Sequence, residues 1–370
     1  SVTAFLWTGK ETAGGGKCKL AWRTVCSPTI YGGLGITDLR LFGFALRLRW
    51  EWLQRAEPDR GRVRLPTKRE PIAVAMFHAS CSVRLGDGKS ASFWNDRWLP
   101  NGPLRCLAPA LFQATSRDGR GRTVSEAVLN RRWVRDISGA TTVQVLCDFL
   151  RIWALACDIV LDTLQADCFV WKWSPDGKFS VSSTYRAFFA GSTELYGAKE
   201  LWRVRAPPKV KFFFWLGLHN RLWTSDRRKR HGLQDDDGCA LCSQASETVS
   251  HLLAGCVVTR EVWFRVLVPV GLHQLMDTLG DGDVAAWWLQ QRLLLDSEKR
   301  QGFDALVLLV SWEVWKERNA RIFRNEVSTV ATIAKRIHDE GSLWIEAGFI
   351  PLATVWAFSD NAGVAQISAV

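Results

Sequence analysis

The stretch C-A-L-C-S-Q-A-S-E-T-V-S-H-L-L-A-G-C, residues 239–256, contains the one tight cluster of metal-ligating residue types in the chain. Two residues separate Cys239 from Cys242, eight separate Cys242 from His251, and four separate His251 from Cys256. Zn²⁺ takes four sulfur or nitrogen ligands in a tetrahedron, and a Cys-x2-Cys turn supplies two of them. Because all four positions are filled, no vertex is left for an activated water. The spacing therefore predicts one structural Zn²⁺, whose binding energy becomes folding energy.

The residues between the two ligand pairs predict a short helix over 247–253, with Ser246 as its N-cap. That helix would present His251 on its last turn, and Gly255 would end it and return Cys256 to the metal. Two alternatives exist. The cysteines of this Cys-rich chain could be unligated core thiols, and His231, eight residues before the first cysteine, could replace His251. The second alternative gives a less compact site.

Composition bounds the class of protein. The chain has 370 residues, 48 Lys and Arg against 37 Asp and Glu, and a formal charge of +11. Apolar residues make up 47% and charged residues 23%, which excludes disordered, collagenous and coiled-coil classes. Twenty tryptophans indicate amphipathic surfaces that meet other domains or partners. The longest aliphatic run, residues 305–310, is far shorter than the ~20 residues of a membrane span.

The ten cysteines occur without a secretory signal peptide, so we expect mostly free thiols in a reducing, intracellular compartment rather than a secreted disulfide framework. The chain opens on Ser1 and has two internal methionines, which is typical of a piece of a longer protein.

Hydrophobic periodicity predicts a mostly α protein with small β-hairpins, an α+β arrangement of several segments. Helices are expected over the ranges 38–54, 143–161, 210–223, 285–298, 303–324 and 329–347. A short strand begins at residue 81. A hairpin is expected where 169–173 and 178–181 flank the turn at Pro175-Asp176-Gly177. The stripe of the 143–161 helix places Cys147 and Cys157 in the core.

A basic run lies just before the cluster, with nine Lys and Arg between Arg203 and Arg230 against a single acid, Asp226. Cations interleaved with Phe and Trp are typical of nucleic-acid surfaces, where cations meet phosphates and rings stack on bases. The alternative is a solvated basic face beside an aromatic core, whose charge also offsets the zinc thiolates. The candidate nucleic-acid-binding residues are Lys209, Lys211, Arg221, Arg227, Arg228, Lys229 and Arg230.

Enzyme chemistry is hard to find in the sequence. Asp235-Asp236-Asp237 lie in a polar loop where solvated turn residues are expected. No histidine lies in a nucleophile or metalloprotease motif. Gly88-Lys89-Ser90 is similar to the end of a phosphate loop, but Val83 stands where that motif needs glycine, so we reject a nucleotide site.

The segments around the cluster resemble the zinc-binding domain that follows reverse transcriptase in plant LINE-type (non-LTR) retrotransposons. The motifs that carry this resemblance are Trp171-x-Trp173, Gly177-Lys178-Phe179-Ser180-Val181, Pro207-Pro208-Lys209-Val210-Lys211-Phe212-Phe213-Phe214-Trp215, Cys239-x2-Cys242, Glu247-Thr248-x2-His251-Leu252-Leu253-x2-Cys256 and Val262-Trp263. Upstream, Phe5-Leu6-Trp7 and Gly32-Gly33-Leu34-Gly35-Ile36 resemble the end of the polymerase region. Gly86-Asp87-Gly88-x4-Phe93-Trp94 resembles the middle segment, and Trp312-x2-Trp315-Lys316-x-Arg318-Asn319-x-Arg321 resembles a following helix.

This resemblance covers about residues 1–348 and implies a segment order. The expected segments are the thumb-like end of the polymerase region (1–60), a connecting region (61–165), the reverse transcriptase zinc-binding domain (166–265), a helical C-terminal region (266–350) and a flexible tail (351–370). An exposed basic linker is expected over 57–70.

The polymerase centre of the family holds two metal ions with a Tyr-x-Asp-Asp turn, and no tyrosine of this chain is followed by such a pair. The acidic set of a ribonuclease H and an endonuclease domain are likewise not found. The resemblance thus implies a non-catalytic zinc-binding accessory region that binds template RNA or target DNA. The alternatives are a scaffold module that docks the polymerase core, or an inactive retroelement remnant. Nucleic acid and the polymerase portion of the same polyprotein are the expected partners, without a membrane or small-molecule substrate, in the nucleus.

Overall fold

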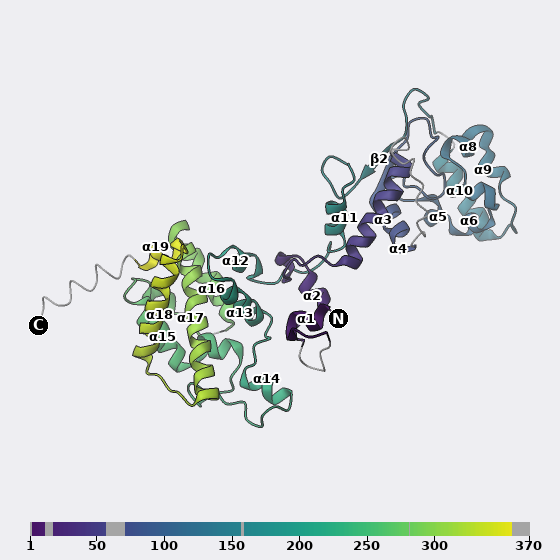
Figure 1. Ribbon diagram of the computed structural model, residues 1–370. Helices are drawn as coiled ribbons and strands as arrows, with labels where there is room; N and C mark the ends of the chain where they lie inside the picture. Colours follow the sequence, from purple (N-terminus) through teal and green to yellow (C-terminus); the bar gives the residue numbers. More distant parts are fainter. Residues whose placement is uncertain (1, 12–17, 57–70, 157–158, 281, 357–370) are drawn as a thin grey trace, which may run out of the picture. The chain divides into compact units, whose positions relative to one another are not determined.

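The computed structural model describes residues 2–11, 18–56, 71–156, 159–280 and 282–356 (Figure 1). The chain forms two compact units. Unit 1 combines residues 1–36 with 192–370, and unit 2 comprises 37–191. Most of the described residues are helical and the only sheet among them has two strands, which confirms the predicted mostly α class with a small β component.

Unit 2 surrounds a core of aromatic side chains that includes Phe77, Phe93, Trp94 and Trp171. Its helices and strands are α3 (Leu39–Ala56), α4 (Pro71–Ser80), β1 (Cys81–Arg84), α5 (Leu104–Leu107), α6 (Pro109–Ala114), α7 (Arg117–Arg120), α8 (Val124–Val128), η2 (Leu129–Arg131), α9 (Arg132–Arg135), α10 (Val143–Ala156), β2 (Cys168–Trp171) and α11 (Val181–Ala187). The predicted 38–54 helix and the strand at 81 are confirmed as α3 and β1.

The predicted hairpin around Pro175-Asp176-Gly177 is wrong. The partner of β2 is β1, which lies far upstream, and the two strands pair antiparallel with Cys81 opposite Trp171. The turn itself exists, because the Trp171 N–H donates to the Gly177 carbonyl at 2.7 Å. The chain after it begins helix α11, whose N-cap Ser180 accepts from the Ser183 N–H. The segment predicted as the second strand therefore leads into a helix, because Ser180 acts as a helix N-cap.

The prediction of which face of α10 is buried is also wrong. Cys147 is exposed, as are Val143, Leu146 and Leu150, whereas the buried positions are Val145, Asp148, Ile152 and Ala156. Asp148 explains the rotation, because its carboxylate accepts from the N–H groups at the start of α6, at 2.9 and 3.2 Å. An anion at a helix N-terminus satisfies donors that no apolar side chain could satisfy. Cys157 lies outside the described residues.

Unit 1 is built around the long helix α17, against which α13 and α18 pack (Figure 1). Its elements are α1 (Val2–Thr8), α2 (Trp22–Cys26), η1 (Thr29–Tyr31), α12 (Ala198–Arg203), α13 (Pro208–Leu218), α14 (Ser225–Arg230), the π-helical turn η3 (His251–Gly255), α15 (Val257–Leu267), η4 (His273–Met276), α16 (Val284–Gln291), η5 (Arg292–Leu294), α17 (Ser297–Arg324), α18 (Val330–Glu346), η6 (Ile350–Leu352) and α19 (Ala353–Trp356).

The helices expected in unit 1 exist, with three corrections to their bounds. The 210–223 helix ends at Leu218, and the 285–298 helix ends at Gln291. Helix α17 begins earlier than residue 303, because Asp296 caps it by accepting from the N–H groups of Glu298 and Lys299. The apolar side expected for the last helix is confirmed by the burial of Ile333, Ile337 and Trp344.

The compact units divide the chain differently from the five segments expected by resemblance. The 166–265 segment contributes to both units, and the 265/266 boundary falls inside α15. The 266–350 region packs in the same unit as the Cys/His cluster. The expected linker at 57–70 and most of the 351–370 tail lie outside the described residues.

Cys18, Cys81, Cys106, Cys147 and Cys168 are free thiols, as expected. None of the helices in the described ranges is long and apolar enough to cross a membrane.

Candidate metal centre

The four predicted ligands lie together in unit 1. Cys239, Cys242, His251 and Cys256 place their ligand atoms within 4.8 Å of one another. The Cys239 N–H donates to Ala245 at 2.8 Å, and Ser243 adopts φ 56° while donating to the Cys239 carbonyl. This tight turn, residues 239–243, is called the knuckle below. It directs both of its sulfurs toward the same point.

The distances fit a tetrahedral zinc ion. With ordinary Zn–S and Zn–N bonds, two sulfur ligands lie about 3.8 Å apart, and a sulfur and a nitrogen lie about 3.6 Å apart. The sulfurs of Cys239 and Cys256 are 3.9 Å apart, and the Cys242 sulfur is 3.4 Å from His251 Nε2. A Cys3His set of this geometry suits Zn²⁺ by both ligand type and spacing. Four protein ligands would fill all positions of a tetrahedral Zn²⁺.

The second ligand pair is His251, the first residue of the turn η3, and Cys256, which directly follows that turn. Thr248, rather than the expected Ser246, caps the helical stretch that begins at Val249 and continues as η3, since its hydroxyl accepts from the His251 N–H at 3.0 Å. His251 therefore lies on the first turn and not on the last. Gly255 ends the turn as predicted, and the Cys256 N–H donates to the His251 carbonyl at 2.6 Å. Residues 251–255 thus span the gap between the two ligands with one helical turn.

The thiols of Cys239 and Cys256 are hydrogen-bonded to each other, and this bond shifts the pKa of both. The hydrogen bond from the Cys239 thiol lowers the pKa of Cys256 to about 5, and the same bond together with burial raises the pKa of Cys239. Zinc replaces these protons, because only thiolates ligate it. Cys239 and Cys256 are buried, and Cys242 and His251 are partly exposed.

A buried carboxylate, Glu247, joins the knuckle to helix α17. Its side chain is fully buried, and one oxygen accepts two hydrogen bonds from the Arg318 guanidinium at 2.6 and 2.9 Å. The same oxygen accepts from the Ser225 N–H at the start of α14, and the other accepts from Ala240 inside the knuckle. Glu247 therefore links three elements that surround the metal position.

A second link runs through Arg321, whose guanidinium donates to the Leu241 carbonyl at 3.0 Å. Arg321 pairs with the buried Glu317, which also pairs with Arg336 of α18. The Ala240 and Leu241 carbonyls of the knuckle thus face one cation of α17. Outer groups of this kind orient a metal site and balance its charge.

Three cations of the basic run contact the fold, one of them buried (Arg227) and two partly buried (Arg228 and Lys211). Arg227 is 4% exposed, donates to the Asn220 carbonyl and lies over the Trp223 ring. Burial and the neighbouring Arg221 lower its pKa. Arg228 lies over the Phe323 ring, and Lys211 donates to the Trp202 carbonyl. The structure therefore does not offer these three side chains to a phosphate as an open charged surface.

Two more cations are exposed and locally paired, Lys229 with Asp237 and Arg230 with Asp226. Lys209 and Arg221 are exposed and lie outside the ion pairs of the described residues. The same holds for two cations beside Lys209 that the candidate set omitted, Arg203 and Arg205. Periodicity could not separate these groups, because it does not tell which faces of α13 and α14 meet the core.

The other sequence candidates lie outside the metal cluster. His231 packs its ring against Trp223, 5.2 Å between centroids, and contributes no ligand atom to the cluster. Asp236 accepts from the Gly238 N–H, as expected of a turn residue. The roles of Glu247 and Arg318 were not predicted from the sequence, although both residues occur in the motifs that carry the resemblance. Both residues stand among polar neighbours in the sequence, so no hydrophobic pattern marked them as buried.

The fold and the cluster together define a helical protein built around a Cys3His centre. Residues 179–263 match the family model described as zinc-binding in reverse transcriptase. The chain is also 27% identical over 324 residues to a putative ribonuclease H protein of Arabidopsis thaliana, covering 75% of this chain. These matches confirm the resemblance to a plant retroelement protein with a reverse transcriptase zinc-binding domain, and they fit a retrotransposon-derived chain. The chain spans about half the length of this curated relative. No solved structure matches it.

Proposed function

We propose that this chain is a zinc-stabilised accessory region of a retroelement reverse transcriptase and that it binds template RNA or target DNA. The observation that carries the proposal is the group of unpaired cations at the connection between α12 and α13. Arg203, Arg205 and Lys209, called the basic turn below, are exposed, and no carboxylate of the described residues forms an ion pair with them. Unpaired cations release counterions when they meet phosphates.

Aromatic side chains accompany the basic turn. Lys209 Nζ lies 5.8 Å from the centre of the half-buried Trp312 ring. Trp202 precedes the turn, and its indole N–H is buried without an acceptor in the described part of the chain. Cations beside aromatic rings provide both phosphate contacts and stacking surfaces for single-stranded nucleic acid. Such a surface favours binding with weak sequence preference.

The test removes the three charges of the basic turn by Arg203→Gln, Arg205→Gln and Lys209→Gln. Binding to a single-stranded RNA and to a DNA is measured over a range of salt concentrations. Each lost phosphate contact lowers the dependence of log K on log salt by roughly 0.7 to 0.9. We expect weaker binding to both nucleic acids and a slope smaller by about 2.

A matched control removes three charges that already have carboxylate partners, Lys229→Gln, Arg230→Gln and Arg324→Gln. Its net charge equals that of the test variant, so a general charge effect would weaken both alike. We expect the control to keep most of the affinity and salt dependence. Equal losses in the two variants, with equal zinc content, contradict the proposed surface.

A protein-docking role is the second candidate, favoured by the exposed apolar stripe of Val143, Leu146 and Leu150 on α10. Apolar docking on the polymerase portion of the polyprotein depends little on salt, unlike phosphate binding. Replacing Leu146 and Leu150 by Ser would abolish such docking at low and high salt alike. It would leave nucleic-acid binding by the basic turn intact.

Catalysis is not part of the proposal. The sequence has no Tyr-x-Asp-Asp turn to hold two metal ions. With template, primer and nucleotides supplied, we expect primer extension no greater than in a control without protein. Extension that depends on the chain would overturn the non-catalytic assignment. We also propose a nuclear location, which imaging of the tagged chain tests; an inactive remnant would instead give no detectable expression.

A further inference from the structure

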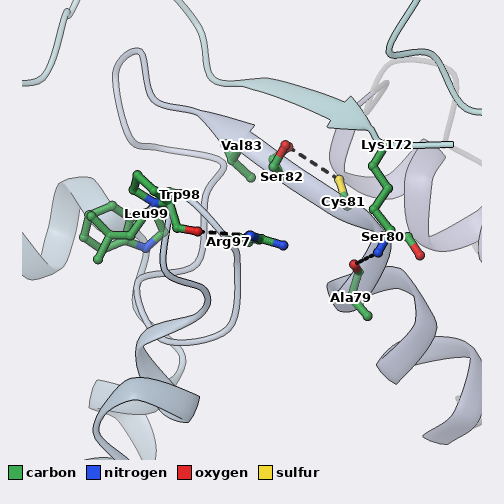
Figure 2. A pocket seen from close by; sticks show the side chains of 10 residues that line it. Ala79, Ser80, Cys81, Ser82, Val83, Arg97, Trp98, Leu99 and Lys172 are labelled. Atoms are coloured by element: carbon green, nitrogen blue, oxygen red, sulfur yellow. Dashed lines mark hydrogen bonds between the residues drawn. The ribbon is translucent and has the colours of Figure 1, made fainter. Parts of the chain in front are cut away.

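A cavity of about 320 Å³ lies beside strand β1 in unit 2. Its walls are residues 79–83, 97–100 and Lys172, and none of these residues is acidic. Two cationic side chains reach into it from different segments, Arg97 from the chain beside β1 and Lys172 from just after β2 (Figure 2). The cavity therefore carries two positive charges and no negative one.

Both segments are fixed to the small sheet. The Lys172 N–H donates to the Ser80 carbonyl at 3.0 Å, which continues the β1–β2 pairing. Arg97 pairs with Ser82 in an isolated parallel bridge, and the Val83 N–H donates to the Arg97 carbonyl at 2.8 Å. The backbone positions of the two cations are thus set by hydrogen bonds. A binding site on fixed elements loses little entropy when a ligand arrives.

Neither cation is neutralised. Lys172 Nζ donates to the Ala79 carbonyl at 2.7 Å, and Arg97 donates to the Pro100 carbonyl at 3.0 Å (Figure 2). These acceptors are neutral, and within the described ranges no carboxylate lies at ion-pair distance from either side chain. The carboxylate next in sequence, Asp96, is buried and already bonded to Arg55 and the Ser92 N–H. Each cation keeps further donors for a ligand.

The two charges also repel each other. Burial and the charge of Arg97 lower the pKa of Lys172. A ligand with negative oxygens would relieve both effects, because it supplies opposite charge and hydrogen-bond acceptors together. The Ser82 hydroxyl lines the same cavity and adds a neutral donor.

We propose that this cavity binds a phosphate group, that of a nucleic-acid strand. A phosphodiester presents two oxygens that share one negative charge, which a guanidinium and an ammonium can hold from two sides, and both Arg and Lys are established phosphate-binding side chains. The site lies in unit 2 and does not rest on the basic turn of unit 1. Inorganic phosphate shares its chemistry and serves as the small probe.

The test uses the full zinc-loaded chain and a variant with Arg97→Gln and Lys172→Gln. Binding of inorganic phosphate and of a thymidine oligonucleotide without terminal phosphates is measured by titration. We expect inorganic phosphate to bind roughly tenfold or more weakly to the variant. The oligonucleotide should lose affinity as well, with a salt dependence smaller by about 0.7 per lost contact.

Lys178→Gln with Arg186→Gln is the matched control, since it also removes two positive charges and both residues are exposed in the same unit and do not line the cavity. A charge-preserving variant, Arg97→Lys with Lys172→Arg, should recover most of the binding. Loss of inorganic phosphate alone supports the phosphate site and assigns it to a small phosphate-bearing ligand instead of a strand. Binding of both probes equal to that of the control overturns the proposal.

A measurement on the unaltered chain covers the case in which the variants fail to fold. Acetylation of Lys172 by an amine-reactive reagent is followed by peptide mass spectrometry, with Lys178 as the internal reference. Added phosphate should slow the reaction at Lys172 and leave that at Lys178 unchanged. An unchanged rate at Lys172 contradicts the site. Neither result depends on the basic turn, so this proposal and the proposed function can fail separately.

Discussion

Two tight loops, one in each unit, are ordered by different groups. In unit 1 the knuckle is arranged around a Cys3His cluster that fits zinc. In unit 2 the loop at 86–91 wraps the carboxylate of Asp167. The N–H groups of Gly86 and Gly88 donate to one oxygen, and those of Ser90 and Ala91 to the other, at 2.9 to 3.0 Å.

The contacts of Asp167 give a structural role to the glycine-containing segment that resembles a phosphate loop. The Gly86-Asp87-Gly88-Lys89-Ser90 segment resembles a phosphate loop because it does surround an anion, and that anion is the chain's own carboxylate. Backbone N–H groups that converge on one point need a negative partner. The loop of unit 2 is therefore ordered by a carboxylate of the same chain, whereas we expect the knuckle to be ordered by a zinc ion taken from solution. The stability of unit 1 should depend on metal, and that of unit 2 should not.

The largest expected effect is metal removal. A chelator should unfold the knuckle, α14 and the adjoining end of α17, since structural zinc contributes about 10–16 kcal/mol of apparent binding energy in small zinc domains. Hydrogen exchange of peptides from the two units measures this directly. Unit 2 is the internal control. Equal loss of protection in both units, or none in unit 1, would break the comparison.

The next effect concerns the buried ion pair that joins the knuckle to α17. Arg318→Met leaves the Glu247 charge buried with only neutral donors, at a cost of about 3–5 kcal/mol in the free energy of unfolding. Replacing both partners, with Glu247→Gln added, should cost less than the single change. Arg324→Met, which removes an exposed pair with Glu326, is the control and should cost under about 1 kcal/mol. Denaturant unfolding at fixed zinc concentration measures all three.

In unit 2 the corresponding change is Asp167→Ala, which leaves four backbone N–H groups without their carboxylate. We expect a loss of about 2 kcal/mol, because nearby water replaces part of the interaction. Asp167→Asn keeps one acceptor oxygen and should lose less. Zinc content should stay that of the unaltered chain. A zinc content lowered by Asp167→Ala would show that the two loops are not independent.

The smallest effect is a dependence on pH. Burial raises the pKa of Glu313, whose side chain is fully buried on α17 and contacts Lys316 at the surface. The folded state then binds more protons than the unfolded state above the ordinary value of 4.5, so stability falls as pH rises through that window. Glu313→Gln removes this cost and should stabilise the chain by about 1 kcal/mol at neutral pH. Below the ordinary pKa it should change nothing. A loss of stability at neutral pH would contradict this sign.

The sequence predicts best what depends on spacing alone. The four ligands of the cluster, the extent of α3 and the turn at Gly177 all follow from residues close together in the chain. The N-cap of the ligand turn was misplaced by two residues, from Thr248 to Ser246, because both residue types make the same hydrogen bond.

The sequence predicts poorly what depends on distant partners. The face of α10 is set by Asp148 at the start of α6, and β2 pairs with a strand about ninety residues upstream. In the basic run, Arg227 is buried against Trp223 while Arg221 nearby is exposed, a difference that charge counts do not contain. The hydrophobic periodicity of one sequence predicts that a helix is amphipathic, but it does not identify the distant segment that packs against it.

The most direct test of the account is the zinc content of the purified full chain by elemental analysis. We predict one zinc per chain, and none in the double variant Cys239→Ser/Cys256→Ser. The matched control Cys18→Ser/Cys106→Ser changes two exposed thiols outside the cluster and should keep its zinc. A chain without zinc, or a Cys239→Ser/Cys256→Ser variant that retains it, would contradict the central claim that this cluster is a structural zinc centre.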